Sequence, residues 1–266
     1  MKTYAYQLDI QWEKKEDNFR KIRKLTELHQ PDKGNLIILP EMFATGFSMN
    51  TEITQEKEDG PSENFLKTFA SETGCYVIGG MTLTKTIGKP TNDALLISPD
   101  GRRVGEYSKI HPFSLGKENE HYAEGNKVFT FELPNVFRIC PFICYDLRFP
   151  EIFRIAMQSD QPPHLFVVIA NWPNRRTQHW VRLLEARAIE NLAYVAGINR
   201  CGSDPYLDYD GSSMIIDPSG KVLADAQKSE GIISRKLNLE TVREWRSQFP
   251  ALRDKRAMCA LQPKRQ

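Results

Sequence analysis

Residues 139–150 read ICPFICYDLRFP, and this stretch decides the fold. The apolar run Phe137–Ile143 predicts a buried strand, and Pro150 is typical of the first turn of a helix. Cys144 follows directly after the strand. A side chain on such a strand-to-helix turn is exposed, and the next backbone N–H faces a bound carbonyl group, as in a nucleophile elbow. By itself the stretch leaves two alternatives, a cysteine nucleophile and a buried, inert thiol.

Strand-like and helix-like segments alternate on both sides of this stretch. The expected strands span Thr3–Leu8, Asn35–Leu39, Cys75–Met81, Asp93–Ser98, Arg103–Lys109, Leu165–Ala170, Tyr194–Asn199, Ser213–Ile216 and Lys221–Ala224. The expected helices span Glu13–Gln30, Ser62–Glu72, Glu151–Gln158 and Arg176–Asn191. Turn residues at 99–101 and 217–220 predict two hairpins. This mixture of βα units and hairpins favours a layered α/β fold with mixed sheets.

Length and charge are those of an ordinary globular protein. The 266 residues include 36 Lys+Arg and 34 Asp+Glu, and the net charge of +2 gives no electrostatic footprint for nucleic acid or an acidic membrane. No apolar run approaches the ~18 residues of a membrane helix. No linker or repeat interrupts the pattern, so we expect one domain over residues 1–253, followed by a basic tail over residues 254–266.

Cysteine and histidine usage argues against a disulfide framework and against a metal site. The chain has five cysteines, an odd number without a C-x-x-C pair, and its five histidines show no ligand spacing. The N-terminal residues lack the apolar segment of a secretory signal. We therefore expect a reduced, cytoplasmic protein that uses no metal and no other cofactor.

Two further strands end in reactive side chains. Glu41 comes just after the strand that stops at Pro40, where partial burial would raise its pKa toward that of a general base. Lys109 ends another strand and offers an ammonium donor to a developing oxyanion. In isolation, a glutamate or lysine at such a position is more often a solvated side chain at the sheet edge or surface. Together with Cys144, they supply the base, oxyanion donor and nucleophile of an acyl-transfer site.

The ordered motifs LPE (residues 39–41), YSKIH (107–111) and CYDLRFP (144–150) resemble the nitrilase superfamily of carbon–nitrogen hydrolases. Further motifs match in the same order, namely NWP at 171–173, HW at 179–180 and ARAIEN at 186–191. The likeness runs from about residue 3 to about residue 250. It implies a four-layer αββα sandwich that pairs into a homodimer.

The resemblance also assigns residues. It maps a catalytic triad onto Glu41, Lys109 and Cys144. The family's second glutamate falls seven residues before a glycine, and Gly125 points to Glu118. Glu120 lies close enough in the sequence to be the alternative.

The substrate is suggested by the motif NWPNRRTQHW at residues 171–180, which resembles the ω-amidase branch of the superfamily. Members of that branch hydrolyse the terminal amide of 2-oxoglutaramate or 2-oxosuccinamate. Such an anion needs a cation, and Arg176, or Arg175, is the candidate; a helix-end or dimer contact is the structural alternative. We expect Phe43, Phe113 and Trp172 to wall a small pocket, and the N–H of Tyr145 to complete the oxyanion site.

Two other functions stay open at this point. The chain is compatible with a different amidase of the superfamily, acting on an N-carbamoyl compound or on the amide of a deaminated peptide. It is also compatible with a catalytically silent binding module on the same fold. The intact set of Glu41, Lys109 and Cys144 argues against the silent module.

Overall fold

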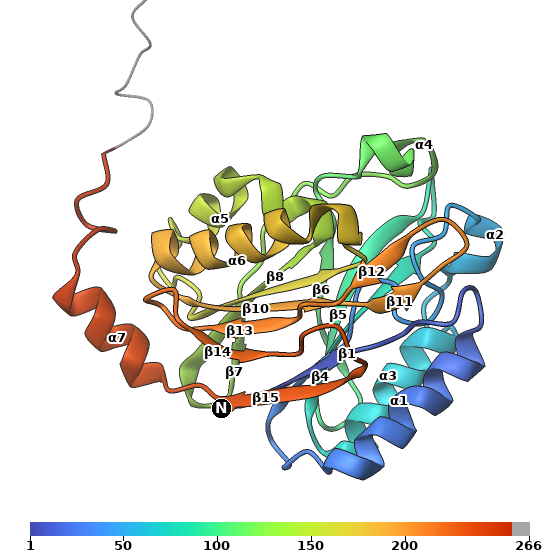
Figure 1. Ribbon diagram of the computed structural model, residues 1–266, viewed down its shortest axis with the longest axis horizontal. Helices are drawn as coiled ribbons and strands as arrows, with labels where there is room; N and C mark the ends of the chain where they lie inside the picture. Colours follow the sequence, from blue (N-terminus) through green and yellow to red (C-terminus); the bar gives the residue numbers. More distant parts are fainter. Residues whose placement is uncertain (257–266) are drawn as a thin grey trace, which may run out of the picture.

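Two β-sheets pack face to face, and helices cover the outer side of each, as Figure 1 shows for this computed structural model. The structure describes residues 1–256. From one outer surface to the other, the layers are helices α1 (Lys15–His29) and α3 (Pro61–Thr73), the first sheet, the second sheet, and helices α5 (Pro150–Ala156) and α6 (Thr177–Asn191). The αββα sandwich expected from the sequence is confirmed.

The first sheet is mixed. It contains β1 (Lys2–Gln7), β2 (Leu36–Ile38), β3 (Gln55–Glu56), β4 (Tyr76–Leu83), β5 (Thr91–Ile97), β6 (Arg103–Ser108) and β15 (Gly231–Lys236). The spatial order is β15-β1-β2-β4-β5-β6, with β3 beside β4. Strands β1, β2 and β4 are parallel, whereas β5 pairs antiparallel with both β4 and β6. Consequently the carboxyl ends of β2, β4 and β6 and the start of β5 lie at one edge of the sheet.

The second sheet is also mixed. It contains β7 (Phe131–Leu133), β8 (Phe137–Ile143), β9 (Leu165–Ala170), β10 (Tyr194–Asn199), β13 (Met214–Ile216) and β14 (Val222–Asp225). The spatial order is β14-β13-β10-β9-β8-β7. Because β8, β9 and β10 are parallel, their carboxyl ends also meet at one edge. Strands β13 and β14 form the second expected hairpin.

Apolar side chains fill the space between these layers. One core joins the facing sides of the sheets and continues beneath α5 and α6, where Phe142 and Phe166 are fully buried. The other core lies under α1 and α3, where the rings of Phe19 and Phe65 stack with centroids 4.4 Å apart. Burying a side chain of this size contributes about 1.5–3 kcal/mol. The two sheets therefore form a firm base for the loops that leave the strand ends.

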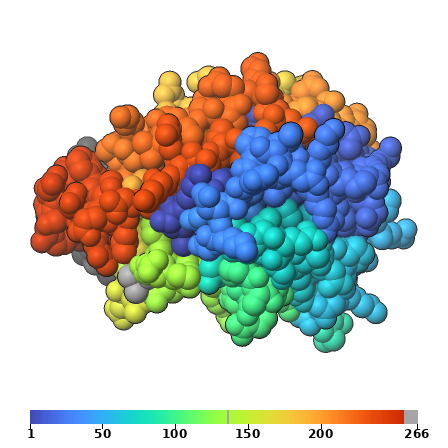
Figure 2. All heavy atoms as spheres, turned by 90° about the horizontal axis from the view of Figure 1, so that it is seen from below, coloured from blue at the N-terminus to red at the C-terminus, as the bar shows by residue number. Residues whose placement is uncertain are grey.

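Several elements were absent from the sequence prediction. They are β3, β7, β15, helix α7 (Leu239–Gln248), the hairpin of β11 (Cys201–Ser203) and β12 (Asp208–Asp210), and the short helices α2 (Thr51–Thr54) and α4 (Glu118–His121). Helix α7 carries a short apolar stripe at Leu239, Val242 and Trp245, of which Val242 is fully buried, so the sequence prediction overlooked a usable signal there. Figure 2 shows the red C-terminal segment projecting at one end of the molecule. Residues 257–266 of the expected basic tail lie outside the described residues.

Within residues 1–256, no helix combines the length and the apolar character needed to cross a bilayer. The same part of the chain holds no group of three or more His, Cys, Asp or Glu side chains placed to bind a metal ion.

Candidate active site

Strand ends from both sheets meet at one end of the sandwich. Glu41 lies just beyond β2 and Lys109 just beyond β6, while Cys144 follows β8 and Asn171 follows β9. The backbone N–H of Asn171 donates to Glu41 Oε2 at 2.7 Å, so the two sheets are joined at this point. The polar side chains that follow the strands are thus gathered in one place, as is usual at the carboxyl ends of strands in α/β proteins.

Three ionisable side chains form what we call the buried ion cluster: Glu41, Lys109 and Glu118. Lys109 Nζ lies 3.0 Å from Glu41 Oε1 and 2.8 Å from Glu118 Oε2, and all three side chains are at most 1 % exposed. Glu120, the sequence alternative to Glu118, is exposed. The structure therefore brings Glu118, and not Glu120, to the lysine.

Neutral groups complete the hydrogen bonding of this cluster. Asn92 Nδ2 donates to Glu41 Oε1 at 2.7 Å and to Glu118 Oε1 at 2.9 Å. The backbone N–H of Phe113 donates to Glu118 Oε2 at 2.6 Å. Sequence reasoning missed Asn92, although it sits at the start of β5, which runs antiparallel and therefore begins at the same sheet edge. These hydrogen bonds hold the two buried carboxylate groups in position.

The close approach of two chain segments holds Lys109 in place. The backbone N–H of Gly125 donates to the carbonyl oxygen of Lys109 at 2.7 Å. A Cβ at position 125 would lie only 2.2 Å from the carbonyl oxygen of Ser108, so glycine is required there.

The charge states in the site follow from burial and from neighbouring charges. Burial opposes the charged form of Lys109, but the carboxylates of Glu118 and Glu41 outweigh burial and raise the lysine pKa. Burial raises the pKa of Glu118, with the charge of Lys109 opposing this effect. Burial also raises the pKa of the Cys144 thiol well above its ordinary value; the Glu41 carboxylate adds to this shift and Lys109 opposes it. The cysteine therefore holds its proton at neutral pH and needs a base to become a nucleophile.

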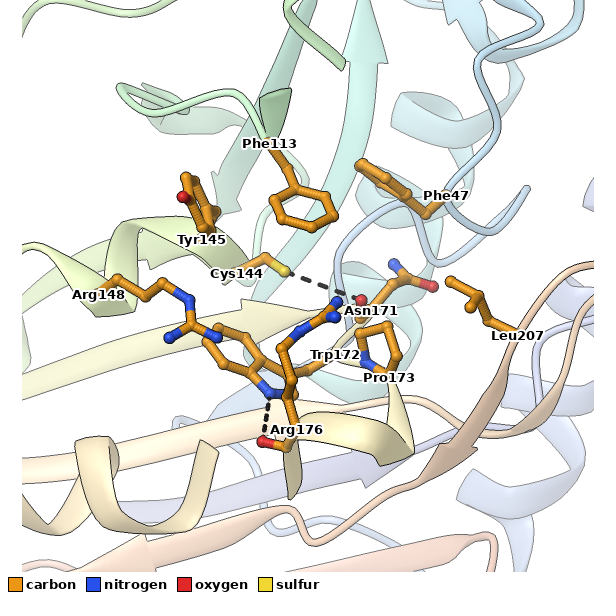
Figure 3. A pocket seen from close by; sticks show the side chains of 10 residues that line it. All are labelled: Phe47, Phe113, Cys144, Tyr145, Arg148, Asn171, Trp172, Pro173, Arg176 and Leu207. Atoms are coloured by element: carbon orange, nitrogen blue, oxygen red, sulfur yellow. Dashed lines mark hydrogen bonds between the residues drawn. The ribbon is translucent and has the colours of Figure 1, made fainter. Parts of the chain in front are cut away.

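Cys144 occupies the strand-to-helix turn predicted from the sequence. Its φ of +47° is in the left-handed region, where a residue with a Cβ is strained. The thiol is 8 % exposed and donates to the carbonyl oxygen of Asn171 at 3.8 Å, which Figure 3 shows as a dashed line. Cys75 and Cys140 are buried free thiols whose pKa is raised by burial.

A buried carboxylate ties the cysteine turn to the segment that carries Lys109. Asp146 accepts hydrogen bonds from Tyr107 Oη at 2.8 Å and from the backbone N–H of Ile143 at 3.1 Å. It also accepts from the backbone N–H of His111 at 3.0 Å and contacts His111 Nδ1 at 2.8 Å. Asp146 therefore fixes the position of the cysteine turn relative to the lysine segment.

A small pocket opens onto Cys144. Figure 3 shows the side chains of Phe113, Tyr145 and Trp172 around the thiol, together with those of Arg148 and Arg176. We call these five residues, with Phe47 and Leu207, the pocket wall. Four of them, Phe113, Tyr145, Trp172 and Arg176, were among the predicted substrate-binding residues.

Arginine placement in the wall only partly matches the sequence analysis. Arg176 lines the pocket, whereas Arg175 is exposed and does not. Arg148 was missed as a candidate, although it lies four residues after Cys144 on the same turn. Burial and the nearby charge of Arg176 lower the pKa of Arg148, so two like charges face the pocket together.

The prediction that Phe43 lines the pocket is wrong. Its ring is fully buried on the helix side of the first sheet, 6.0 Å from the ring of Phe19 and 5.8 Å from that of Phe65. The aromatic side chain that reaches the pocket from this segment is Phe47. The two rings are four positions apart in the sequence, and the tight turn after Glu41 directs the first inward and the second to the site.

Comparison with known proteins identifies the family. Residues 3–247 match the carbon-nitrogen hydrolase family, and the chain belongs to it. The omega-amidase YafV of Yersinia enterocolitica is 37% identical over 256 residues, which cover 96% of each chain. The 2-oxoglutaramate amidase of Bacillus subtilis is 33% identical, with 93% of this chain and 95% of the relative covered.

A solved structure supports the same conclusion. It is that of a CN-hydrolase superfamily protein of Xanthomonas campestris with an arsenic adduct in the active site. The two chains share 33% identity with a TM-score of 0.91, and the match covers 97% of this chain and 98% of the other. The resemblance drawn from the motifs is therefore confirmed.

Proposed function

We propose that this protein is an ω-amidase, which hydrolyses the terminal amide of a small 2-oxo acid such as 2-oxoglutaramate or 2-oxosuccinamate. The observation that carries the proposal is the pairing of Arg148 and Arg176 in one small pocket with Cys144. A carboxylate bound between the two guanidinium groups would relieve the repulsion that lowers the pKa of Arg148. The names of the similar Yersinia and Bacillus enzymes support the same substrate class.

The reaction begins with proton transfer from the Cys144 thiol to Glu41. The sulfur forms a bond to the amide carbon, and the carbonyl electron pair moves onto oxygen. The Lys109 ammonium and the backbone N–H of Tyr145 stabilise this oxyanion. Glu41 then gives its proton to the amide nitrogen, the carbon–nitrogen bond breaks, and ammonia leaves behind a thioester.

The second half of the reaction uses the same groups. Glu41 takes a proton from water, and the water oxygen attacks the thioester carbon. The carbon–sulfur bond breaks, the sulfur regains a proton, and the 2-oxo dicarboxylate leaves. Glu118 keeps Lys109 charged and in place, because its carboxylate balances the ammonium where water cannot.

Assembly and location belong to the same proposal. Ile155 on α5 and Ile189 on α6 are 53% and 52% exposed and line one groove of the outer helix layer with Phe249, which is 50% exposed. We propose that a second copy of the chain covers this face to form a homodimer. Sedimentation of Ile155→Glu at a lower mass than the wild type would support this interface.

The free thiols of Cys75, Cys140, Cys144 and Cys201 favour a reducing, cytoplasmic location.

Ammonia release from a substrate panel tests the function. The panel contains 2-oxoglutaramate, 2-oxosuccinamate, N-carbamoyl compounds, amides of deaminated peptides and nitriles. Hydrolysis of the two oxo-amides with the highest kcat/KM is the expected result. A preference for carbamoyl compounds or peptide amides would move the protein to another amidase activity, and no turnover of any compound would favour a silent binding module.

The role of the two arginines has its own test. We expect Arg176→Ala and Arg148→Ala each to raise KM for 2-oxoglutaramate about 10- to 100-fold, since a hydrogen bond to a charged group contributes about 1.5–3 kcal/mol. The KM for a neutral amide of similar length should hardly change. Arg175→Ala, on the exposed neighbouring residue, is the matched control. Equal losses on charged and neutral amides would contradict carboxylate binding at these residues.

A further inference from the structure

Three side chains of the pocket wall also line a second, outer cavity. Phe47, Phe113 and Leu207 border both the pocket that holds Cys144 and a larger outer cavity. The outer cavity continues past Trp12 and other side chains toward the surface. These three side chains therefore form the boundary between the two cavities.

Two of the three boundary residues are tied to the buried ion cluster. The backbone N–H of Phe113 donates to Glu118 Oε2 at 2.6 Å. The ring of Phe47 lies 5.2 Å from Lys109 Nζ. Leu207, in contrast, comes from the β11–β12 hairpin, and Figure 3 shows it on the far side of the pocket from Arg148. Leu207 is therefore the boundary residue whose size can vary without disturbing the catalytic groups.

A well-defined turn holds Leu207 in this position. Asp204 Oδ1 accepts from the backbone N–H groups of Tyr206 and Leu207, each at 2.8 Å. Asp204 Oδ2 accepts from Tyr209 Oη at 2.6 Å. The Tyr206 ring packs edge-on against Trp12, with centroids 5.7 Å apart. The hairpin tip is thus anchored on both sides, and the leucine is a fixed part of the wall.

We propose that Leu207 is a specificity-determining residue that limits the length of the substrate's acyl chain. This inference rests on the proposed ω-amidase function. The amide carbon is fixed at Cys144 and the carboxylate is fixed at Arg148 and Arg176. A substrate with one more methylene between these two ends must therefore bend outward against the pocket wall. Leu207 is the boundary residue that is not tied to the buried ion cluster, and open volume lies behind it, so its size decides whether the bulge fits.

The experiment measures kcat/KM for the ω-amides of four-, five- and six-carbon 2-oxo acids. Leu207→Ala should raise the six-carbon to five-carbon ratio by about tenfold or more, because one methylene in a tight pocket changes kcat/KM by roughly 10- to 200-fold. Leu207→Phe should act in the opposite direction and favour the four-carbon substrate. Ser203→Ala is the matched control, since it lies on the same hairpin, is exposed and borders neither cavity.

Opposite shifts in Leu207→Ala and Leu207→Phe would support the proposal, because a merely loosened hairpin would shift both variants the same way. Unchanged ratios in both variants, with wild-type activity on 2-oxoglutaramate retained, would overturn the role of Leu207 alone. Absence of activity on all three oxo-amides in the wild-type enzyme would instead overturn the proposed function.

Discussion

In the buried ion cluster, the lysine is paired with carboxylates of opposite charge. The two guanidinium groups of the pocket wall instead contact aromatic rings and carry like charges. The Lys109 ammonium donates to two carboxylates at 2.8–3.0 Å. The Arg148 guanidinium lies 4.8 Å from the Trp172 ring, and that of Arg176 lies 5.4 Å from the Phe113 ring. The first region is a set of charges already desolvated and fixed before substrate binds. The second is a pair of like charges that an anion would stabilise.

The two regions therefore have different roles: one lowers the barrier of the reaction, and the other selects the substrate. Groups fixed by other protein groups change little between free enzyme and transition state, so they lower the barrier of the reaction. Charged groups that receive an opposite charge only from the ligand determine which ligand binds. Substitutions in the buried ion cluster and at Cys144 should therefore lower kcat, and substitutions in the pocket wall should change KM and the choice of substrate.

The largest expected effect is that of Cys144→Ala. Loss of the nucleophile should lower kcat by at least about 10⁴-fold, while the fold is retained because the thiol fills little volume. Cys201→Ala is the matched control, since Cys201 is also a buried free thiol but borders neither the pocket nor the buried ion cluster. Steady-state ammonia release and circular dichroism of both variants provide the measurement. Turnover of Cys144→Ala at a tenth of the wild-type rate would exclude a covalent role for this residue.

The next effects fall on the base and the oxyanion donor. Glu41→Gln should lower kcat by about 10²–10⁴-fold and Lys109→Met by about 10²–10³-fold, with much smaller changes in KM. Because each variant leaves a buried partner charge unbalanced, the thermal midpoint should fall as well. The two effects are separated by assaying at a temperature at which each variant is folded. A folded Lys109→Met enzyme with near-normal kcat would remove the oxyanion role of the lysine.

Glu118 and Glu120 provide a comparison within one short helix. Glu118→Gln should lower kcat by about 10- to 100-fold, because Lys109 loses one of the two carboxylates that hold its position and charge. Glu120→Gln should leave kcat unchanged, since that side chain is exposed. Parallel kinetics of the two variants decide the assignment. An inactive Glu120→Gln beside a fully active Glu118→Gln would reverse it.

The smallest effect concerns the link between cysteine turn and lysine segment. Asp146→Asn replaces one accepting oxygen by an NH2 group that cannot accept from Tyr107 or Ile143, so kcat should fall by about tenfold with KM nearly constant. Tyr107→Phe removes one of these bonds and should have a smaller effect. A positioning role predicts this split between kcat and KM. A fall in thermal midpoint with wild-type kcat at assay temperature would instead indicate a purely structural role.

Much of the fold could be predicted because its strands are buried on both faces. Runs such as Leu165–Ala170 are uniformly apolar, and α1 and α3 carry clear apolar stripes. Strand β15 could not be predicted, since its side chains are half-buried or exposed and its partner β1 lies at the other end of the chain. Helix α7 carries a short apolar stripe that the sequence prediction overlooked, and its position also depends on long-range bonds from Arg246 to the carbonyl oxygens of Leu192 and Pro163.

The candidate site could be predicted where a reactive side chain follows closely after a strand, as for Glu41, Lys109 and Cys144. Asn92 gave no such signal, because it begins a strand and its partners lie far away in the sequence. Phe43 and Phe47 are both aromatic and close in sequence, so only the turn between them decides which one reaches the pocket. The direction of a side chain after a tight turn does not follow the regular residue spacing of a strand or a helix, so the sequence pattern could not decide between the two rings.

Trapping the covalent intermediate tests the central claim most directly. The wild-type enzyme is mixed with 2-oxoglutaramate, quenched in acid within the first turnover, digested and analysed by mass spectrometry. We predict a 2-oxoglutaryl group on the peptide that contains Cys144, its absence from the peptides of Cys75, Cys140 and Cys201, and its disappearance once substrate is exhausted. Ammonia release without any acylated Cys144, or with the acyl group on another cysteine, would contradict the account.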